Sequence, residues 1–302
     1  MKKYIIMWSA FLFIEVAYSQ DYLSTSSYYM NAFSINPAFS GVGDELFLTF
    51  QANKYTGSQS GKGIDYISFG GYYNLGAGLA SGLRLNSQQL GNVDYSSLDI
   101  SLSYKAQLNK DHFLSFTLAP GLYREQFVQN TSDYSQWVDR GDQLLFGEGG
   151  STFDRTLVTV GAGILYNFKG LQVSAYLPYL LRGKESFSSN FTAYAKYVYN
   201  EAQDRAQVKF GNYALFKYQP DASYIYDVGT LVGFQDAVWV NLAYRSNQSA
   251  AVGMVFIIPD MQVGYNFNYS FGDFQDLIHT KHELTLVFVT NKLMKFRTRK
   301  LW

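Results

Sequence analysis

The chain has 302 residues, of which 16% are charged and 18% aromatic, and its 24 basic residues are balanced by 24 acidic ones. A net charge of zero gives no electrostatic argument for binding nucleic acid. The absence of cysteine excludes disulfides and thiolate metal sites. The charged fraction is below the roughly 25% of soluble domains, whereas membrane β-barrels carry aromatic girdles at both water interfaces. The composition therefore favours a membrane barrel.

The first residues have the pattern of a secretory signal peptide. Lys2–Lys3 supply the positive region, residues 4–14 are mainly apolar, and Ala17–Ser19 form a small-x-small cleavage site. We expect residues 1–19 to be removed, which leaves Gln20 as the mature N-terminus. The alternative is an N-terminal anchor helix, but the apolar stretch is shorter than the ~20 residues of a membrane span. No run of 18 apolar residues follows, so a membrane location would require a barrel.

Most of the remaining chain alternates between apolar and polar residues. In residues 97–108, Leu102 and the other apolar residues lie on one face, and Ser101 and the other polar residues lie on the opposite face. Residues 238–245 and 261–270 repeat this pattern. A two-faced soluble sheet would alternate in the same way. Strand length and the shortage of charge on the apolar faces favour lipid, and we predict that Leu102 faces lipid and Ser101 the lumen.

Turn signals divide the chain into strands. Tight turns at 74–76, 109–111, 168–170 and 258–260 contrast with long connections at 54–63, 127–155 and 181–191. Membrane barrels place short turns in the periplasm and long loops outside. The parity holds only if residues 192–200 form a strand, and both termini are then periplasmic. The fourteen predicted strands span 44–53, 64–73, 77–87, 93–108, 112–126, 156–167, 171–180, 192–200, 207–219, 221–233, 237–246, 249–258, 260–270 and 281–290.

The fold prediction is therefore all-β, a transmembrane antiparallel barrel over residues 44–290. Residues 20–43 form a periplasmic or plug segment, and residues 291–302 form a basic tail that is either solvated or bound to anionic headgroups or an acidic partner. For Asn36–Ala38, the favoured interpretation is a periplasmic cap fixed by Pro37, and the alternative is a plug that enters the lumen or contacts a partner. The predicted lumen-side charges are Arg84, Asp99, Lys105, Arg124 and Arg245.

Motifs for catalysis are missing from the sequence. His282 and Glu283 suggest acid–base or metal chemistry, but zinc needs three or four converging ligands and the chain has 3 His. Residues 57–61 lack the central serine of a nucleophile elbow. Residues 76–78 lack the third glycine of a dinucleotide fingerprint. We predict no enzyme, no cofactor and no metal site.

Residues 28–41 read Tyr-Tyr-Met-Asn-Ala-Phe-Ser-Ile-Asn-Pro-Ala-Phe-Ser-Gly and resemble the N-terminal signature of the PorP/SprF family. The signature residues are Asn36, Pro37, Ala38 and Gly41. Weaker matches follow in order at 79–91, 171–178, 243–245, 264–268 and 281–284, whereas residues 53–57 lack the Arg and Trp of the family's first hairpin. The family consists of outer-membrane barrels associated with type IX secretion and gliding motility.

The resemblance implies a barrel that docks or anchors a large type IX-secreted surface adhesin, through the adhesin's C-terminal domain, or supports its secretion. Periplasmic secretion or motor components are further implied partners, with outer-membrane lipid around the barrel. The long connection at 127–155 carries apolar and aromatic residues typical of interface anchors. They are Tyr134, Trp137, Leu144, Leu145 and Phe146. The alternative function is a porin-like channel or small-solute transporter.

Overall fold

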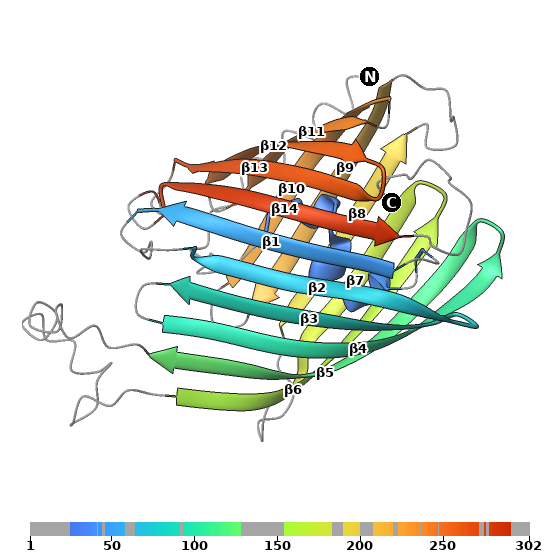
Figure 1. Ribbon diagram of the computed structural model, residues 1–302, viewed down its shortest axis with the longest axis horizontal. Coiled ribbons are helices and arrows are strands. Elements are labelled where there is room, and N and C mark those ends of the chain that lie inside the picture. Colours follow the sequence, from blue (N-terminus) through green and yellow to red (C-terminus); the bar gives the residue numbers. More distant parts are fainter. Residues whose placement is uncertain are drawn as a thin grey trace, which may run out of the picture.

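The protein forms a closed barrel of fourteen antiparallel strands in the computed structural model, in which each strand pairs with its neighbours in sequence and β14 pairs with β1 (Figure 1). The structure describes residues 25–40, 42–43, 46–57, 64–90, 93–127, 154–182, 190–199, 208–219, 223–235, 237–246, 248–271, 275 and 278–290. Within these ranges, no helix is both long and apolar enough to cross a membrane.

The strands are β1 (Leu46–Thr56), β2 (Tyr66–Gly76), β3 (Leu79–Leu90), β4 (Val93–Asn109), β5 (His112–Phe127), β6 (Asp154–Phe168), β7 (Leu171–Arg182), β8 (Phe191–Tyr199), β9 (Val208–Gln219), β10 (Ser223–Phe234), β11 (Val238–Arg245), β12 (Ser249–Ile258), β13 (Met261–Ser270) and β14 (Thr280–Thr290). Among the described residues, three short 3-10 helices precede them, namely η2 (Ser27–Tyr29), η3 (Ala32–Ser34) and η4 (Pro37–Phe39).

The predicted strand number and alternation are confirmed. The uncertain strand at residues 192–200 is β8, and the other predicted bounds agree to within a few residues. On β4, Leu102 is 56% exposed on the outer wall, whereas its neighbour Ser101 is 2% exposed on the inner wall. Successive side chains of a strand point to opposite faces, so one apolar–polar alternation builds both the apolar exterior and the polar interior.

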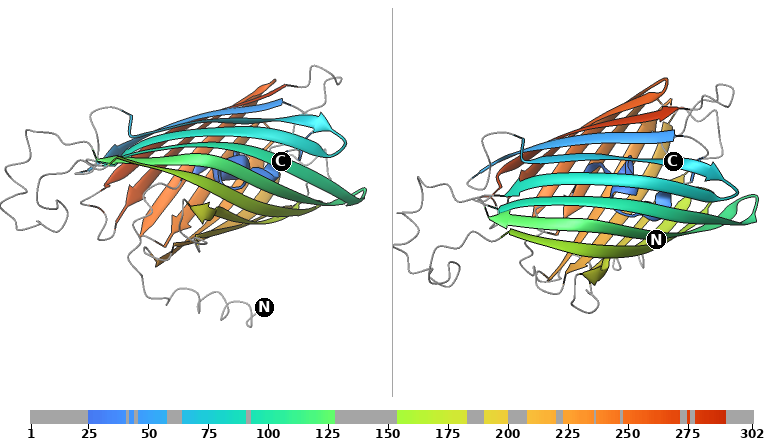
Figure 2. Two further views of the ribbon diagram at one scale, coloured as in Figure 1. Left: turned by 90° about the horizontal axis from the view of Figure 1, so that it is seen from below. Right: turned by 60° about the horizontal axis from the view of Figure 1, so that its bottom comes forward.

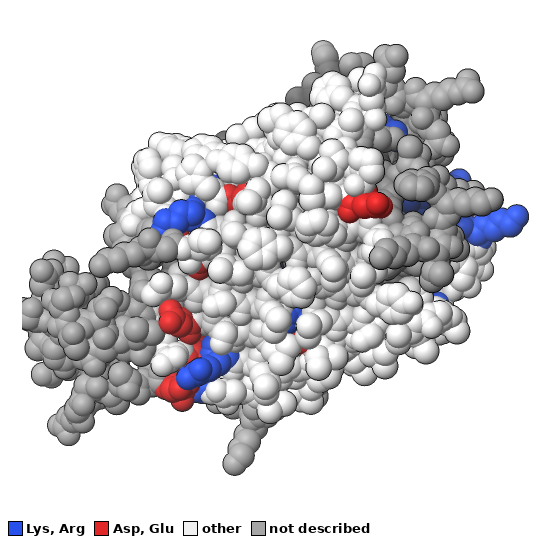
Figure 3. All heavy atoms as spheres, viewed as in Figure 1, with Lys and Arg blue, Asp and Glu red and all other residues white. Residues whose placement is uncertain are grey.

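The exterior carries few charges. Figure 3 shows one face of the barrel on which Lys, Arg, Asp and Glu stand mainly toward the strand ends. Exposed leucines, phenylalanines and tyrosines occupy the strand faces between these ends. An apolar band bordered by polar rims is the surface that a bilayer requires of a membrane-spanning barrel.

One charged residue was assigned to the wrong wall. Arg84, Asp99, Lys105 and Arg245 stand on the inward positions of their strands, but Arg124 does not. Two residues before Arg124 in β5, Leu122 is 45% exposed on the outer wall, and the period of two places Arg124 on that wall as well. Its guanidinium pairs with Asp154 at the start of β6, with Nε 2.8 Å from Oδ1. The Asp154 carboxylate on the next strand therefore neutralises the positive charge of Arg124 on the outer wall.

Residues 25–40 lie inside the barrel, where η2, η3 and η4 appear as blue turns within the ring of strands (Figure 2). Of the two interpretations of Asn36–Ala38, this position in the lumen favours the plug over the periplasmic cap. Cleavage before Gln20 and the role of residues 291–302 lie outside the described residues and remain predictions.

The described lumenal residues, 25–40 and 42–43, run along the length of the barrel. At one end, Thr25 hydrogen-bonds Glu283 near the start of β14, where the long connections lie. At the other end, the carbonyl of Gly43 accepts from Asn74 Nδ2 at 3.4 Å, close to the tight turn between β2 and β3. The chain thus enters its first strand from the short-turn end after crossing the lumen. Residues 20–43 were expected to form a periplasmic or plug segment, and the described part of this range lies in the lumen.

Candidate functional site: the plugged lumen

Aromatic rings form the centre of the plug, which we define as residues 25–40. The Tyr28 ring packs edge-to-face against Tyr194 of β8 and Tyr213 of β9, with ring centroids 5.7 and 5.3 Å apart. Tyr29 stacks on Tyr213 at 5.8 Å, and Phe39 meets Tyr194 edge-on at 6.0 Å. All of these rings are buried. Rings from the plug and the wall therefore share one core inside the barrel, where an open pore would hold water.

A carboxylate of β14 binds the start of the plug. The Ser26 N–H donates to both oxygens of Glu283, at 3.1 and 2.9 Å, and the Thr25 hydroxyl donates at 3.0 Å. The Ser27 hydroxyl also donates to this carboxylate. Lys281, two residues earlier on the same inner face, places its Nζ 3.3 Å from Glu283 Oε2. Since Glu283 is fully buried, these donors replace the water that its charge loses.

An arginine of β3 holds the middle of the plug. Arg84 donates from Nη1 to the Ser34 carbonyl at 3.0 Å, and from Nη2 to Asp99 at 3.1 Å and to the Tyr176 hydroxyl at 3.0 Å. The ring of Phe33 lies 6.0 Å from the guanidinium carbon. A single planar side chain thus links the plug to three strands, a geometry to which the fork of donors on arginine is suited.

The Asn-Pro-Ala signature fastens the end of the plug. Asn36 Nδ2 donates to the carbonyls of Ile164 and Ala175 at 3.2 and 3.1 Å, while its Oδ1 accepts from the Ala38 N–H at 2.9 Å and caps η4. Pro37 occupies the first turn of η4, where a missing N–H is harmless. Ala38 is fully buried. Asn36 therefore ties the plug to β6 and β7, and the Pro37 carbonyl accepts from the Ser103 hydroxyl of β4 at 3.2 Å, whereas Gly41 lies outside the described residues.

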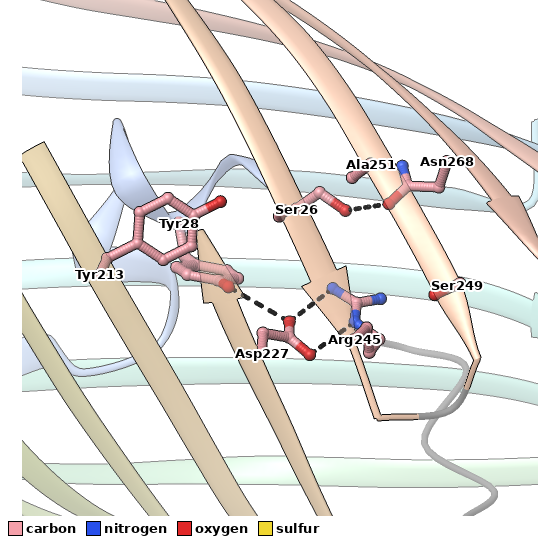
Figure 4. A pocket seen from close by; sticks show the side chains of 9 residues that line it. Ser26, Tyr28, Tyr213, Asp227, Arg245, Ser249, Ala251 and Asn268 are labelled. Atoms are coloured by element: carbon pink, nitrogen blue, oxygen red, sulfur yellow. Dashed lines mark hydrogen bonds and ion pairs between the residues drawn. The ribbon is translucent and has the colours of Figure 1, made fainter. Parts of the chain in front are cut away.

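A small cavity opens beside Tyr28 (Figure 4). Tyr28 donates to Asp227 Oδ2 at 3.2 Å, and Arg245 binds the same carboxylate through two nitrogens at 2.8 and 2.7 Å. Burial raises the pKa of the Tyr28 hydroxyl well above its usual value, and burial raises that of Tyr29 as well, so both hydroxyls stay protonated donors. The cavity has a volume of about 10 Å³, close to the size of one water. It is too small for a substrate.

A larger cavity lies at the long-connection end of the barrel, and we call it the mouth chamber. Its volume is about 210 Å³, measured in the same way as the 10 Å³ of the cavity beside Tyr28. Plug residues Thr25, Ser34 and Ile35 border it, together with inward side chains of the wall such as Tyr66 and Asn86. The plug thus separates this chamber from the short-turn half of the lumen.

His282 and Glu283, whose residue types suggested acid–base or metal chemistry in the sequence, do not lie together in space. Glu283 points into the lumen, whereas His282 lies on the outer wall and contacts the Tyr265 hydroxyl at 2.7 Å. Across the described part of the chain, no group of three or more potential metal ligands comes together. The predicted docking residues Tyr134, Trp137, Leu144, Leu145 and Phe146 lie outside the described residues.

Sequence reasoning missed three of the groups that hold the plug. Glu283, Lys281 and Asp227 were not among the predicted lumenal charges, although the period of two places each on the inner face of its strand. Extending the alternation of β14 to its first residues would have separated Glu283 from His282. The partners within the plug could not be read in this way, because irregular backbone has no such period.

A closed barrel with an apolar outer band, a polar inner wall and short turns at one end is the architecture of a bacterial outer-membrane protein. The chain belongs to the PorP/SprF family, since residues 17–288 match the family described as type IX secretion system membrane protein PorP/SprF. The resemblance noted in the sequence is thereby confirmed, and with it the outer-membrane location. No curated protein matches the chain by sequence.

Solved structures of outer-membrane channels share the fold. The CymD monoaromatic hydrocarbon channel is 11% identical, with 91% of this chain and 94% of that chain covered and a TM-score of 0.51. The Pseudomonas putida toluene transporter TodX is 8% identical, with 91% and 95% covered and a TM-score of 0.50. At such identities the likeness concerns the fold alone.

Proposed function

We propose that this protein docks or anchors a large type IX-secreted surface adhesin at the outer membrane, through the adhesin's C-terminal domain, or supports its secretion. The observation that carries the proposal is the filled lumen in a member of a type IX secretion family. A barrel occupied by its own chain offers its rim and loops as binding surfaces in preference to a wide aqueous path.

The connection between β5 and β6 is the proposed docking surface. It carries Tyr134, Trp137, Leu144, Leu145 and Phe146 among the charged residues Asp133, Asp139, Arg140 and Asp142. Interfaces commonly have aromatic anchors at the centre and charges at the rim. Loops that connect strands can be changed without unfolding a barrel, because strand pairing closes it. Periplasmic secretion or motor components would bind at the opposite, short-turn end.

The second candidate function is a porin-like channel or small-solute transporter. The shared fold of CymD and TodX, which are a hydrocarbon channel and a toluene transporter, supports it, as does the mouth chamber. The lining of the chamber argues against an apolar solute, because hydroxyl and amide side chains stand among its rings. Displacing the plug would be a further requirement for transport.

The experiment compares two loop variants of the full chain in its own host. One replaces the five apolar and aromatic residues of the 127–155 connection by Ser, and the other replaces Asp133, Asp139 and Asp142 by Asn. We expect the first to lower the amount of adhesin on intact cells at least tenfold and the second to change it little. A larger deletion, of residues 130–150, should have the effect of the first variant. Single-channel current is recorded from the same purified barrels. Unchanged adhesin display with a raised current would replace the docking role by the channel role.

A further inference from the structure

The mouth chamber is lined by aromatic rings together with side chains that form hydrogen bonds. Tyr66, Tyr123 and Tyr176 line it from β2, β5 and β7. The amide of Asn86 and the hydroxyl of Ser97 belong to the same lining. Aromatic rings pack against C–H groups, whereas hydroxyls and amides bind polar groups. The chamber therefore suits a ligand that carries C–H faces and polar groups together.

The polar groups of the lining are held in place and keep hydrogens for a ligand. Asn86 Oδ1 accepts from the Tyr66 hydroxyl at 3.1 Å, and Asn86 Nδ2 donates to Ser97 Oγ at 3.0 Å. The Tyr176 hydroxyl accepts from Arg84 Nη2 at 3.0 Å. Neither Ser97 nor Tyr176 donates its hydroxyl hydrogen to another described residue. Since a hydroxyl can accept and donate at once, both remain donors toward the chamber.

The charges of the lining are balanced. Three charged side chains of the described residues line the chamber, namely Arg84, Asp99 and Lys217. Arg84 Nη2 lies 3.1 Å from Asp99 Oδ2, and Lys217 interacts with another residue as well. Asp99 Oδ1 accepts no hydrogen bond from a described residue, so it stays available as an acceptor. An anion would need an uncompensated positive charge, and the chamber therefore suits an uncharged ligand.

The chamber is small, and the plug closes one side of it. Its volume of about 210 Å³ is below the roughly 300–1,000 Å³ of pockets for drug-sized ligands. The plug residues Ser34 and Ile35 border it, and Arg84 fixes this border by donating to the Ser34 carbonyl at 3.0 Å. A ligand in the chamber is therefore compact and is held against the plug.

We infer that the mouth chamber binds a neutral saccharide of one or two rings. The C–H face of a sugar packs on the tyrosine rings, and its hydroxyls accept from Ser97 and Tyr176 and donate to Asp99. A hydrocarbon would leave these three groups without partners, which disfavours it. The inference goes beyond adhesin docking and does not depend on it, because the proposed docking surface is the connection between β5 and β6.

The first experiment is saturation-transfer NMR on the purified full-length barrel in lauryldimethylamine oxide, a detergent without a sugar headgroup. The probes are glucose, galactose, N-acetylglucosamine, maltose and cellobiose. We expect at least one of them to bind with a dissociation constant in the millimolar range or below. Toluene, inorganic phosphate and the tripeptide glycyl-tyrosyl-glycine are the rival probes and should not displace the sugar. Failure of all five sugars to bind, or displacement by a rival probe, would overturn the inference.

Two adjacent serines of β4 test whether the sugar lies in the chamber. Ser97 lines the chamber, and Ser96 is exposed on the outer wall. Ser97→Trp fills the chamber, whereas Ser96→Trp places the same ring on the outer wall, where aromatic residues are tolerated. We expect the dissociation constant to rise at least tenfold in Ser97→Trp and to stay unchanged in Ser96→Trp. Equal affinity in the two variants would place the sugar elsewhere and overturn the inference.

A milder pair of variants covers the case in which Ser97→Trp loses the gel mobility shift on heating that marks a folded barrel. Ser97→Ala removes one hydroxyl and adds no volume, so we expect the barrel to stay intact. The loss of one hydrogen bond should raise the dissociation constant roughly threefold to tenfold. Ser96→Ala should not change it. Wild-type affinity in Ser97→Ala would contradict the proposed binding mode.

The failure of this inference and the failure of docking can be told apart. Sugar binding is measured on the purified barrel, whereas docking is measured as adhesin on intact cells carrying the loop variants. Loss of sugar binding in the loop variants would overturn the placement of the sugar in the chamber, because the chamber is lined by the barrel wall and the plug.

Discussion

Glu283 is the residue whose removal tests the plug most directly. The Glu283→Ala substitution deletes a fully buried carboxylate that accepts from Thr25, Ser26 and Ser27. It also leaves the Lys281 ammonium, 4% exposed, without its nearest counter-charge. The ladders of β14 with β1 and β13 are made by backbone groups and do not depend on this side chain. The expected result is therefore a loosened plug in an intact barrel.

The free-energy change caused by Glu283→Ala can be worked out from the burial of Glu283 and Lys281. Breaking a buried ion pair by removing one partner costs about 3–5 kcal/mol, because the remaining charge is uncompensated. Each plug donor left without an acceptor adds about 1–3 kcal/mol unless water enters. Since 1.4 kcal/mol corresponds to a factor of ten, about 3–5 kcal/mol shifts the equilibrium between docked and undocked plug by roughly two to four orders of magnitude. Aromatic packing around Tyr28 and the hydrogen bond from Arg84 to the Ser34 carbonyl oppose this shift toward the undocked plug.

The assay is single-channel current of the purified barrel in planar bilayers, combined with limited proteolysis at the plug tyrosines. We expect frequent openings and cleavage near Tyr28 in Glu283→Ala, and neither in the wild-type barrel. His282→Gln, a change at the adjacent residue on the outer wall, is the control and should behave as wild type. Wild-type current and full protection of the plug in Glu283→Ala would refute the reasoning and assign the holding force to the aromatic core.

Two further pairs of substitutions test the outer wall and the packing of the plug against the inner wall. Leu102→Arg, at mid-strand, should cost about 2–4 kcal/mol and impair assembly, whereas Leu108→Arg near the strand end should cost about 0–1 kcal/mol, as measured by folding into vesicles. Gly82→Ala should lower stability by about 1–3 kcal/mol in chemical unfolding, because a Cβ there would lie 2.7 Å from the Phe33 ring. Gly70→Ala is the control, since its Cβ would meet no atom closer than 3.4 Å. Equal stability within either pair would contradict the assigned packing.

The barrel could be predicted from the sequence because its physics is periodic. Alternation places Leu102 outside and Ser101 inside without reference to any other strand. Turn signals supply the strand limits, and the parity of short and long connections requires the strand at 192–200. The wrong prediction for Arg124 shows that residue type alone does not decide whether a side chain lies on the inner or the outer wall. Its charge was placed inside by polarity, whereas its position in the alternation places it outside, where Asp154 is within reach.

The plug could not be predicted because its contacts have no period. Asn36 reaches carbonyls of Ile164 and Ala175, more than a hundred residues away in the sequence. The short 3-10 helices hold few internal hydrogen bonds, so their conformation depends on the wall. Pro37 fits a cap outside the barrel as well as a tie inside it. Only the tertiary structure distinguishes these two positions.

The plug and the closure of the barrel depend on the same strand. β14 closes the ring by pairing with β1, and within that ladder Glu283 stands opposite Asn53. The side chain of Glu283 then holds Ser26, so the strand that completes the wall also fixes the start of the plug. The plug also contacts the strand on the other side of this seam, because Asn31 Nδ2 donates to Thr49 Oγ1 of β1 at 3.0 Å. Closing the ring thus brings the carboxylate to its donors, and docking the plug strengthens the seam between β1 and β14.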